Sequence, residues 1–270
     1  MDARADCIRL RFTTDEICPR FVSYAFLRPD IIKRIPLRLP SRKVQEEIVG
    51  ILSAYDDLIE NNRRRVALLE ESARLLYQEW FVRLRFPGHG HTQTRDGVPY
   101  GWDRGPLDGA LLLQRGFDLP VQDREEGDVP ILGSTGVVGT HSKAKVDGPG
   151  IVTGRSGTLG EVHYINRSYW PLNTSLWVKE FRRVTPLYAL FLLRSIDLGQ
   201  YNGGASVPTL DRKAAHGAEV LIPPGSLVAE FSTVAEPHYK QVENLAMQNQ
   251  RLKSARDLLL PRLMSGEITI

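Results

Sequence analysis

An apolar repeat from Ile48 to Trp80 is the feature that most constrains how this chain folds. Alternating steps of four and three residues along it meet an apolar side chain at every position except Asn62. This spacing is typical of a coiled coil, in which one face of a long helix packs against a partner helix. An amphipathic core helix is the alternative, but globular helices rarely exceed about twenty residues. We therefore predict a spacer helix over 41–86, with this coiled-coil seam: Ile48, Leu52, Tyr55, Ile59, Val66, Leu69 and Leu76.

A second, weaker copy of the repeat lies 183 residues further along, an offset that places Pro223 on Pro40. Chance similarity between two amphipathic helices is the alternative, although a proline-ended apolar segment precedes both copies. We predict a second spacer helix over 225–270 that pairs antiparallel with the first, since pairing buries both seams. Pro237 predicts a kink near its start, because the proline ring clashes with the preceding helical turn. The second seam comprises Phe231, Val242, Leu245, Leu252 and Leu259.

The region between the two helices has a different composition. A polar linker over 87–97 is followed, over 98–224, by frequent Gly, Pro, Thr and Val and by short apolar runs. Such runs between turn residues are typical of strands. The predicted strands are Leu111–Leu113, Pro130–Gly133, Gly150–Thr153, Glu161–Ile165 and Ser175–Lys179, and one short helix is predicted at Leu187–Ile196. The fold class is therefore α+β, with a mixed α/β domain and two long helices that pair as an antiparallel coiled coil.

Several classes of protein are disfavoured by what the sequence lacks. No apolar run approaches the ~20 residues that a membrane span requires, and the charged N-terminus has no signal-peptide core. Cys7 and Cys18 lack the spacing of a metal site and are typical of reduced thiols, so we expect a cytoplasmic protein. His89 and His91 have no third ligand nearby, and we expect neither a metal nor another cofactor.

A glycine-rich segment over 148–160 superficially resembles a nucleotide-binding loop. It lacks the Gly-Lys-Ser/Thr of a P-loop, and no helix is predicted after it. The glycines instead favour a tight hairpin that brings Arg155 and Ser156 to an exposed tip. An arginine there could bridge a guanine edge or a phosphate with two hydrogen bonds.

Basic and polar residues gather around this hairpin in the sequence. Residues 129–183 carry seven basic and three acidic side chains, whereas 95–128 carry four and eight. A local basic excess attracts phosphates, although most charged runs are simply solvated surfaces. Trp177, between two apolar residues, is expected in the core. The residues predicted to bind DNA are Lys143, Lys145, Arg155, Ser156, Thr158, Tyr164, Arg167, Asn173, Ser206 and Thr209.

No catalytic pattern accompanies these residues. The chain has no Asn-Pro-Pro-Tyr-type motif for amino-methyl transfer, no carboxylate and lysine cluster typical of a nuclease, and no supported Ser/His/Asp set. We therefore predict a protein that binds rather than catalyses.

Six motifs follow one another along the chain, at 69–81 (LEESARLLYQEWF), 86–88 (FPG), 129–136 (VPILGSTG), 151–160 (IVTGRSGTLG), 170–176 (WPLNTSL) and 260–268 (LPRLMSGEI). Taken in this order, they resemble the specificity subunit of type I restriction-modification systems. The resemblance implies a target-recognition domain over 98–224 between two helical spacers that set the distance between two DNA half-sites. It also implies docking of methyltransferase subunits on the helices, with an endonuclease subunit joining that core. The methyl donor and ATP would belong to those partners.

The chain departs from this family at its start, where 1–40 resembles only the end of a first recognition domain. Either the chain is a truncated remnant, or two copies associate and read a palindromic split site. The function predicted is sequence-specific recognition of double-stranded DNA that directs the methyltransferase and endonuclease subunits. The alternative is a non-reading adaptor or decoy that binds methyltransferase subunits through its coiled coil.

Overall fold

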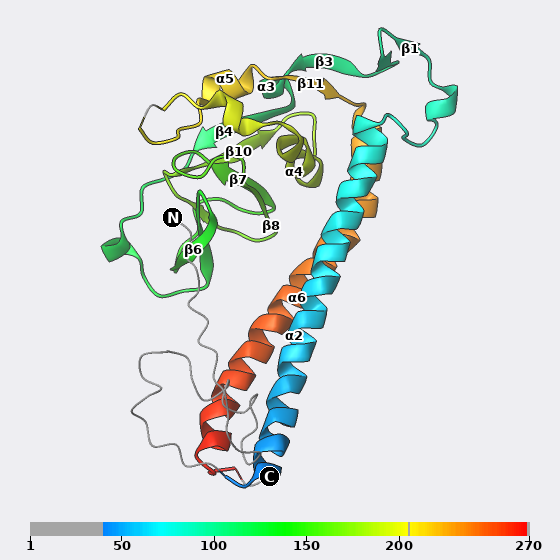
Figure 1. Cartoon of the computed structure of the whole chain (residues 1–270). Helices are drawn as coiled ribbons and strands as arrows, with labels where there is room; N and C mark the ends of the chain where they lie inside the picture. The colour runs from blue at the N-terminus through cyan, green and yellow to red at the C-terminus, as the bar shows by residue number, and fades with distance from the viewer. Residues whose placement is uncertain (1–39, 205, 269–270) are drawn as a thin grey trace. The chain divides into compact units, whose positions relative to one another are not determined.

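The computed structural model describes residues 40–204 and 206–268 (Figure 1), which divide into two compact units. The described part of unit 1 comprises 40–70 and 240–268, and unit 2 comprises Glu71–Tyr239 without residue 205. The predicted remnant over 1–40 lies outside the described residues except at Pro40. The other predicted domain boundaries remain predictions.

Unit 1 is a pair of antiparallel helices. The part of helix α2 (Arg42–Tyr77) up to residue 70 and the part of helix α6 (Gly225–Met264) from residue 240 run side by side in it (Figure 1). Ile48 and Leu52 share one buried cluster with Leu263, whereas Asn62 donates from Nδ2 to Oδ1 of Asn249, 3.0 Å away. The residue numbers of contacting side chains thus rise along α2 as they fall along α6. The predicted antiparallel pairing is therefore confirmed.

The seam of unit 1 follows the predicted repeat. Ile48, Leu52, Ile59 and Leu245 are buried. The remaining predicted seam residues of this unit are half-buried: Tyr55, Val66, Leu69, Val242, Leu252 and Leu259. An ion pair between Asp56 Oδ1 and Arg256 Nη1, 2.6 Å apart, also joins the helices. Helix α6 continues through Pro237, so this proline does not end the helix.

The first helix departs from prediction near its C-terminal end. It passes into one wide turn, η2 (Gln78–Val82), in which Arg83 N–H bonds to the carbonyl of Gln78, and it ends before Arg85. Leu84 follows with a left-handed φ of 58°, which a helix cannot accommodate. The buried residues here are Tyr77 and Phe81, whereas the predicted Leu76 is half-buried beside them. Burial here therefore lies one residue beyond the predicted Leu76, at Tyr77, whose ring packs against Phe191 of α4.

Unit 2 contains four small sheets. Its four-stranded sheet has the order β4-β10-β7-β8, with all neighbours antiparallel. A three-stranded sheet has the order β6-β5-β9, and two pairs, β1-β2 and β11-β3, complete the set. The strands are β1 (Thr94–Arg95), β2 (Val98–Pro99), β3 (Asp103–Pro106), β4 (Leu111–Arg115), β5 (Val129–Gly133), β6 (Gly136–His141), β7 (Gly150–Gly154), β8 (Val162–Ile165), β9 (Trp170–Pro171), β10 (Ser175–Phe181) and β11 (Glu219–Ile222).

Short helical elements connect these strands. They are η3 (His89–His91), α3 (Leu107–Ala110), η4 (Val121–Asp123), α4 (Pro186–Ser195), η5 (Leu198–Tyr201) and α5 (Arg212–His216). The five strands and the helix predicted between the spacers all occur, and the α+β class is confirmed. The short strands β1, β2, β3, β6, β9 and β11 were not predicted.

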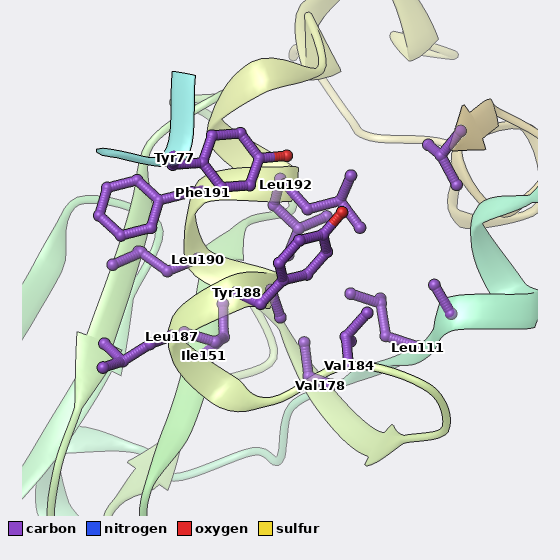
Figure 2. Close-up of a cluster of buried hydrophobic side chains, with 14 of the residues drawn as sticks. Tyr77, Leu111, Ile151, Val178, Val184, Leu187, Tyr188, Leu190, Phe191 and Leu192 are labelled. Carbon is purple, nitrogen blue, oxygen red and sulfur yellow. The ribbon is translucent and has the colours of Figure 1, made fainter. Parts of the chain in front are cut away.

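The core of unit 2 is built around α4. The helix starts at Pro186, and Thr185 caps it by accepting the Tyr188 N–H with its side chain. Every residue from Leu187 to Leu193 is buried, so α4 is surrounded by packing partners (Figure 2). Strand side chains such as Ile151 and Val178 lie on one side of it (Figure 2).

Aromatic rings from both long helices complete this core. Tyr77 stacks on Phe191 at 5.5 Å between ring centroids (Figure 2), and Phe81 meets Tyr188 edge-on at 4.8 Å. Phe231 of α6 is fully buried and packs edge-on against Phe81 at 5.3 Å. These contacts fix the helix segments of unit 2 against α4, which shares one buried cluster with the sheet that carries the loops described next.

Candidate nucleic-acid interface

The predicted hairpin between β7 and β8 is present. Glycines shape its loop: a Cβ at Gly154 would lie 1.9 Å from the Thr158 carbonyl oxygen, and Gly157 has a φ of 91°. Thr153 Oγ1 donates to the Glu161 carbonyl at 2.7 Å and closes the base of the loop. Only glycine at these two positions permits such a tight return of the chain.

Arg155 and Ser156 do not lie at an exposed tip, and that prediction is wrong. Both are half-buried, because their backbone N–H groups donate to the Thr174 carbonyl at 2.9 and 3.0 Å. On the other side, the Arg155 carbonyl accepts the Leu210 N–H at 2.8 Å, and Ser156 forms an isolated bridge with Thr209. The loop is thus held between two other segments of unit 2.

Asn202 shapes a polar loop over 201–204 and 206–209. Its Oδ1 accepts the backbone N–H groups of Gly204 at 3.0 Å and Thr209 at 2.8 Å. Thr209 is half-buried with its hydroxyl bonded to the Val207 carbonyl, whereas Ser206 is exposed. The loop therefore presents Ser206 to solvent and fixes Thr209 beside Ser156.

A segment that the sequence did not single out joins this group. Phe117 donates its N–H to the Pro171 carbonyl at 2.8 Å, and its own carbonyl accepts the Asn173 N–H at 3.0 Å. The next residue, Asp118, accepts through Oδ1 from Asn173 Nδ2 and, at 3.4 Å, from Arg115 Nη2. In turn, Arg155 Nη1 donates to the Asn173 carbonyl at 3.2 Å.

Segments far apart in the sequence thus converge on one surface, which we name the polar junction. It consists of Arg115, Asp118, Arg155, Ser156, Asn173 and Thr209. It combines hydrogen-bond donors and acceptors on a backbone that is hydrogen-bonded across segments, and donors and acceptors are the groups that read base edges. Sequence reasoning missed Arg115 and Asp118 because they lie in the acidic stretch over 95–128. Their position directly after the predicted strand Leu111–Leu113 was the available signal.

The two predicted lysines are both exposed but differ in their contacts. Lys145 Nζ lies 5.7 Å from the ring centroid of Phe117 and 5.2 Å from that of Trp170, so it is held by cation–π contacts beside the polar junction. Lys143 Nζ lies 3.5 Å from Glu125 Oε2. The Ser142 hydroxyl, followed by Lys143, lowers the pKa of Glu125. Glu125 therefore competes with phosphates for Lys143.

Of the other candidates, Thr158 stays with the hairpin loop, whereas Tyr164 and Arg167 lie away from the polar junction. Tyr164 pairs with Ile151, towards the opposite end of β7 from Arg155, and its ring packs 5.3 Å from that of Tyr239. Arg167 is exposed near Gly148. Trp177, expected in the core, is half-buried and packs on the cluster that contains Leu132 and Val152.

Within residues 40–204 and 206–268, no three His, Cys, Asp or Glu side chains are grouped as a metal site. Among the helices of that same part, none combines the length and apolar character of a membrane span.

Comparison with known proteins identifies the group that this chain resembles. No family model matches the chain. It is 23% identical over 274 residues to the type I restriction enzyme MjaIX specificity subunit of Methanocaldococcus jannaschii, covering 90% of this chain and 63% of that protein. It is 20% identical over 325 residues to the type I restriction enzyme HindI specificity subunit of Haemophilus influenzae, covering 88% and 70%. The chain thus spans about 63% of the length of the first relative.

A solved structure shows the same fold. The S subunit of the type I restriction-modification system of M. genitalium superposes with a TM-score of 0.62 at 19% identity, covering 82% of this chain and 60% of that one. The resemblance to type I specificity subunits that the motifs predicted is therefore confirmed.

Proposed function

We propose that this chain is a specificity subunit that reads double-stranded DNA for a type I restriction-modification complex. The observation that carries the proposal is the polar junction, in which Arg155, Asn173 and Asp118 come from separate segments and are tied together by hydrogen bonds. The names of the similar proteins support it, since both are specificity subunits of type I restriction enzymes.

In this proposal the chain itself carries out no catalysis. Unit 2 binds DNA, and the helix pair docks the modification subunits, which supply the methyl donor, while a restriction subunit supplies cleavage. A second copy of the chain would provide a second recognition unit. A cytoplasmic location remains a prediction.

Charge reversal tests DNA binding directly. The change Arg155→Glu with Lys143→Glu and Lys145→Glu should weaken binding to every duplex at low salt and flatten its salt dependence, because fewer counterions are released. Arg83→Glu with Arg85→Glu and Arg95→Glu is a matched control, since it makes the same charge change at exposed positions outside the interface. Unchanged duplex binding by the first variant would contradict the proposal that Arg155, Lys143 and Lys145 face DNA.

Docking is tested separately by co-purifying the full chain with modification subunits and measuring methylation of random duplexes. Methylation at a defined sequence supports the proposal. Co-purification without sequence-directed methylation would instead identify the chain as an adaptor. Light scattering of the full chain shows whether one copy or two supply the recognition surface.

A further inference from the structure

Asp118 is the one carboxylate of the polar junction, and its two oxygens are used differently. Both donors that reach it, Asn173 Nδ2 and Arg115 Nη2, bind Oδ1. No residue in the described part of the chain donates a hydrogen bond to Oδ2. The side chain is 69% exposed. One oxygen therefore orients the carboxylate, and the other faces solvent as an available acceptor.

The backbone around Asp118 is held firmly. Phe117, the preceding residue, exchanges backbone hydrogen bonds with Pro171 and Asn173. A Cβ at Gly116 would lie 2.1 Å from the Leu172 carbonyl oxygen, so the two segments approach as closely as glycine allows. An acceptor fixed in this way loses little conformational entropy on binding.

An acceptor of this kind discriminates among bases in the major groove. Adenine N6 and cytosine N4 are amino groups there, whereas guanine O6 and thymine O4 are acceptors that a carboxylate repels. We propose that Asp118 is a specificity-determining residue, which selects an adenine or cytosine by accepting a hydrogen bond from its exocyclic amino group. This inference rests on the DNA-reading function proposed above.

The charge of Asp118 argues against a general role in affinity. A carboxylate on a surface that meets phosphates opposes binding to any duplex, and Arg115 offsets this only in part. The residue should therefore improve discrimination at one base pair while it weakens binding to unrelated sequences. If Asp118 served affinity alone, it would instead strengthen binding to unrelated sequences.

The test uses the full chain and a panel of duplexes that vary each base of its preferred sequence, which selection from randomised duplexes supplies. Asp118→Asn keeps a carbonyl oxygen for Asn173 and places an amino group where Oδ2 was. At one position the preference should shift from adenine or cytosine towards guanine or thymine by about tenfold. Asp118→Ala should relax the preference there, and both variants should bind unrelated duplexes as tightly as the wild type or more so.

Base analogues identify the partner atom. Purine in place of adenine, or pyrimidin-2-one in place of cytosine, removes the amino group, and whichever analogue weakens wild-type binding about tenfold shows which base is read. Asp118→Ala should be insensitive to that analogue. Asp123→Asn is the matched control, because Asp123 is an exposed carboxylate nearby in the sequence, outside the polar junction. It should leave every preference unchanged.

Two results would overturn the inference: an unchanged base preference in both Asp118 variants, or an equal loss at all positions together with a lower melting temperature. The second result would mean that Asp118 only positions Asn173. A wild-type chain that prefers no sequence at all would overturn the proposed function itself, which is a distinguishable failure.

Discussion

The helix pair of unit 1 and the polar junction of unit 2 are held together in different ways. The helix pair repeats one contact, an apolar side chain packed on the facing helix, at positions such as Leu52 and Leu263. The polar junction uses no repeat, and its contacts join segments that are far apart in the sequence, as Asp118 joins Asn173. The first arrangement tolerates small changes along its length, whereas the second depends on the close approach of particular backbone atoms.

The largest expected effect is a break in the helix pair. Leu52→Ala removes a fully buried side chain and should lower the free energy of unfolding by about 2–5 kcal/mol, because a cavity remains. Leu68→Ala, on the same helix but 69% exposed, should change stability by less than about 0.5 kcal/mol. Chemical denaturation measures both. Equal effects would show that the seam does not carry the stability of unit 1.

The next effect contrasts one substitution in the two regions. Gly116→Ala places a Cβ against the Leu172 carbonyl and should destabilise unit 2 by about 3 kcal/mol. Gly50→Ala, in α2 with nothing within 4 Å, should stabilise the helix by about 1 kcal/mol, since alanine favours helices. Thermal unfolding together with hydrogen exchange measures the loss of stability in the first variant and the gain in the second. A Gly116→Ala variant more stable than the wild type would contradict the close approach of Gly116 to the Leu172 carbonyl.

A smaller effect concerns the polar pair inside the seam. Asn62 donates to Asn249, which in turn donates from Nδ2 to the Ile59 carbonyl at 3.3 Å. Replacing both asparagines by leucine should raise stability by about 1–2 kcal/mol and permit other pairings, including dimers, because buried asparagines fix register at a cost in stability.

Light scattering and denaturation measure this change. Asn61→Leu with Asn244→Leu is the control, since both asparagines are exposed and the chemical change is the same. A double seam variant that is both less stable and uniformly monomeric would show that the pair contributes stability rather than register.

The smallest effect is a pH dependence confined to unit 2. His216 Nε2 accepts the Leu113 N–H at 2.9 Å, which requires a neutral ring, and burial lowers the pKa of His216. Its contribution to stability is therefore complete above the unfolded pKa of about 6.5 and is lost as pH falls below that value, because the unfolded chain binds the proton more readily.

Hydrogen exchange in β4 between pH 5 and 7.5 measures this dependence. Because intrinsic amide exchange slows as pH falls, protection factors are compared: those in β4 should fall towards the acidic end, and His216→Gln should reduce that fall. Protection factors in the seam around Leu245 should respond less. His91→Gln is the control, because His91 is exposed in the linker. An identical pH response in both regions would contradict a local origin at His216.

The sequence predicted the two regions unequally, for a physical reason. The seam follows from local periodicity, so Ile48, Leu52, Ile59 and Leu245 could be assigned from residue spacing alone. Burial near the end of the first helix moves to Tyr77 and Phe81, which pack against the rings of α4, and no spacing rule anticipates such long-range contacts. In the polar junction, the loops were predictable from glycine content, but their pairing was not. The hydrogen bond between residues 118 and 173 depends on long-range contacts, so Arg155 was placed at an exposed tip and Asp118 was overlooked.

Sequencing the duplexes that the full chain selects from a randomised pool tests the central claim most directly, namely that the polar junction reads DNA sequence. The account predicts one enriched motif, and Arg155→Ala should weaken the preference at one of its positions by about tenfold, since an arginine pair with a base contributes about 1–3 kcal/mol. A pool that stays random after selection, or an Arg155→Ala pool identical to that of the wild type, would contradict it.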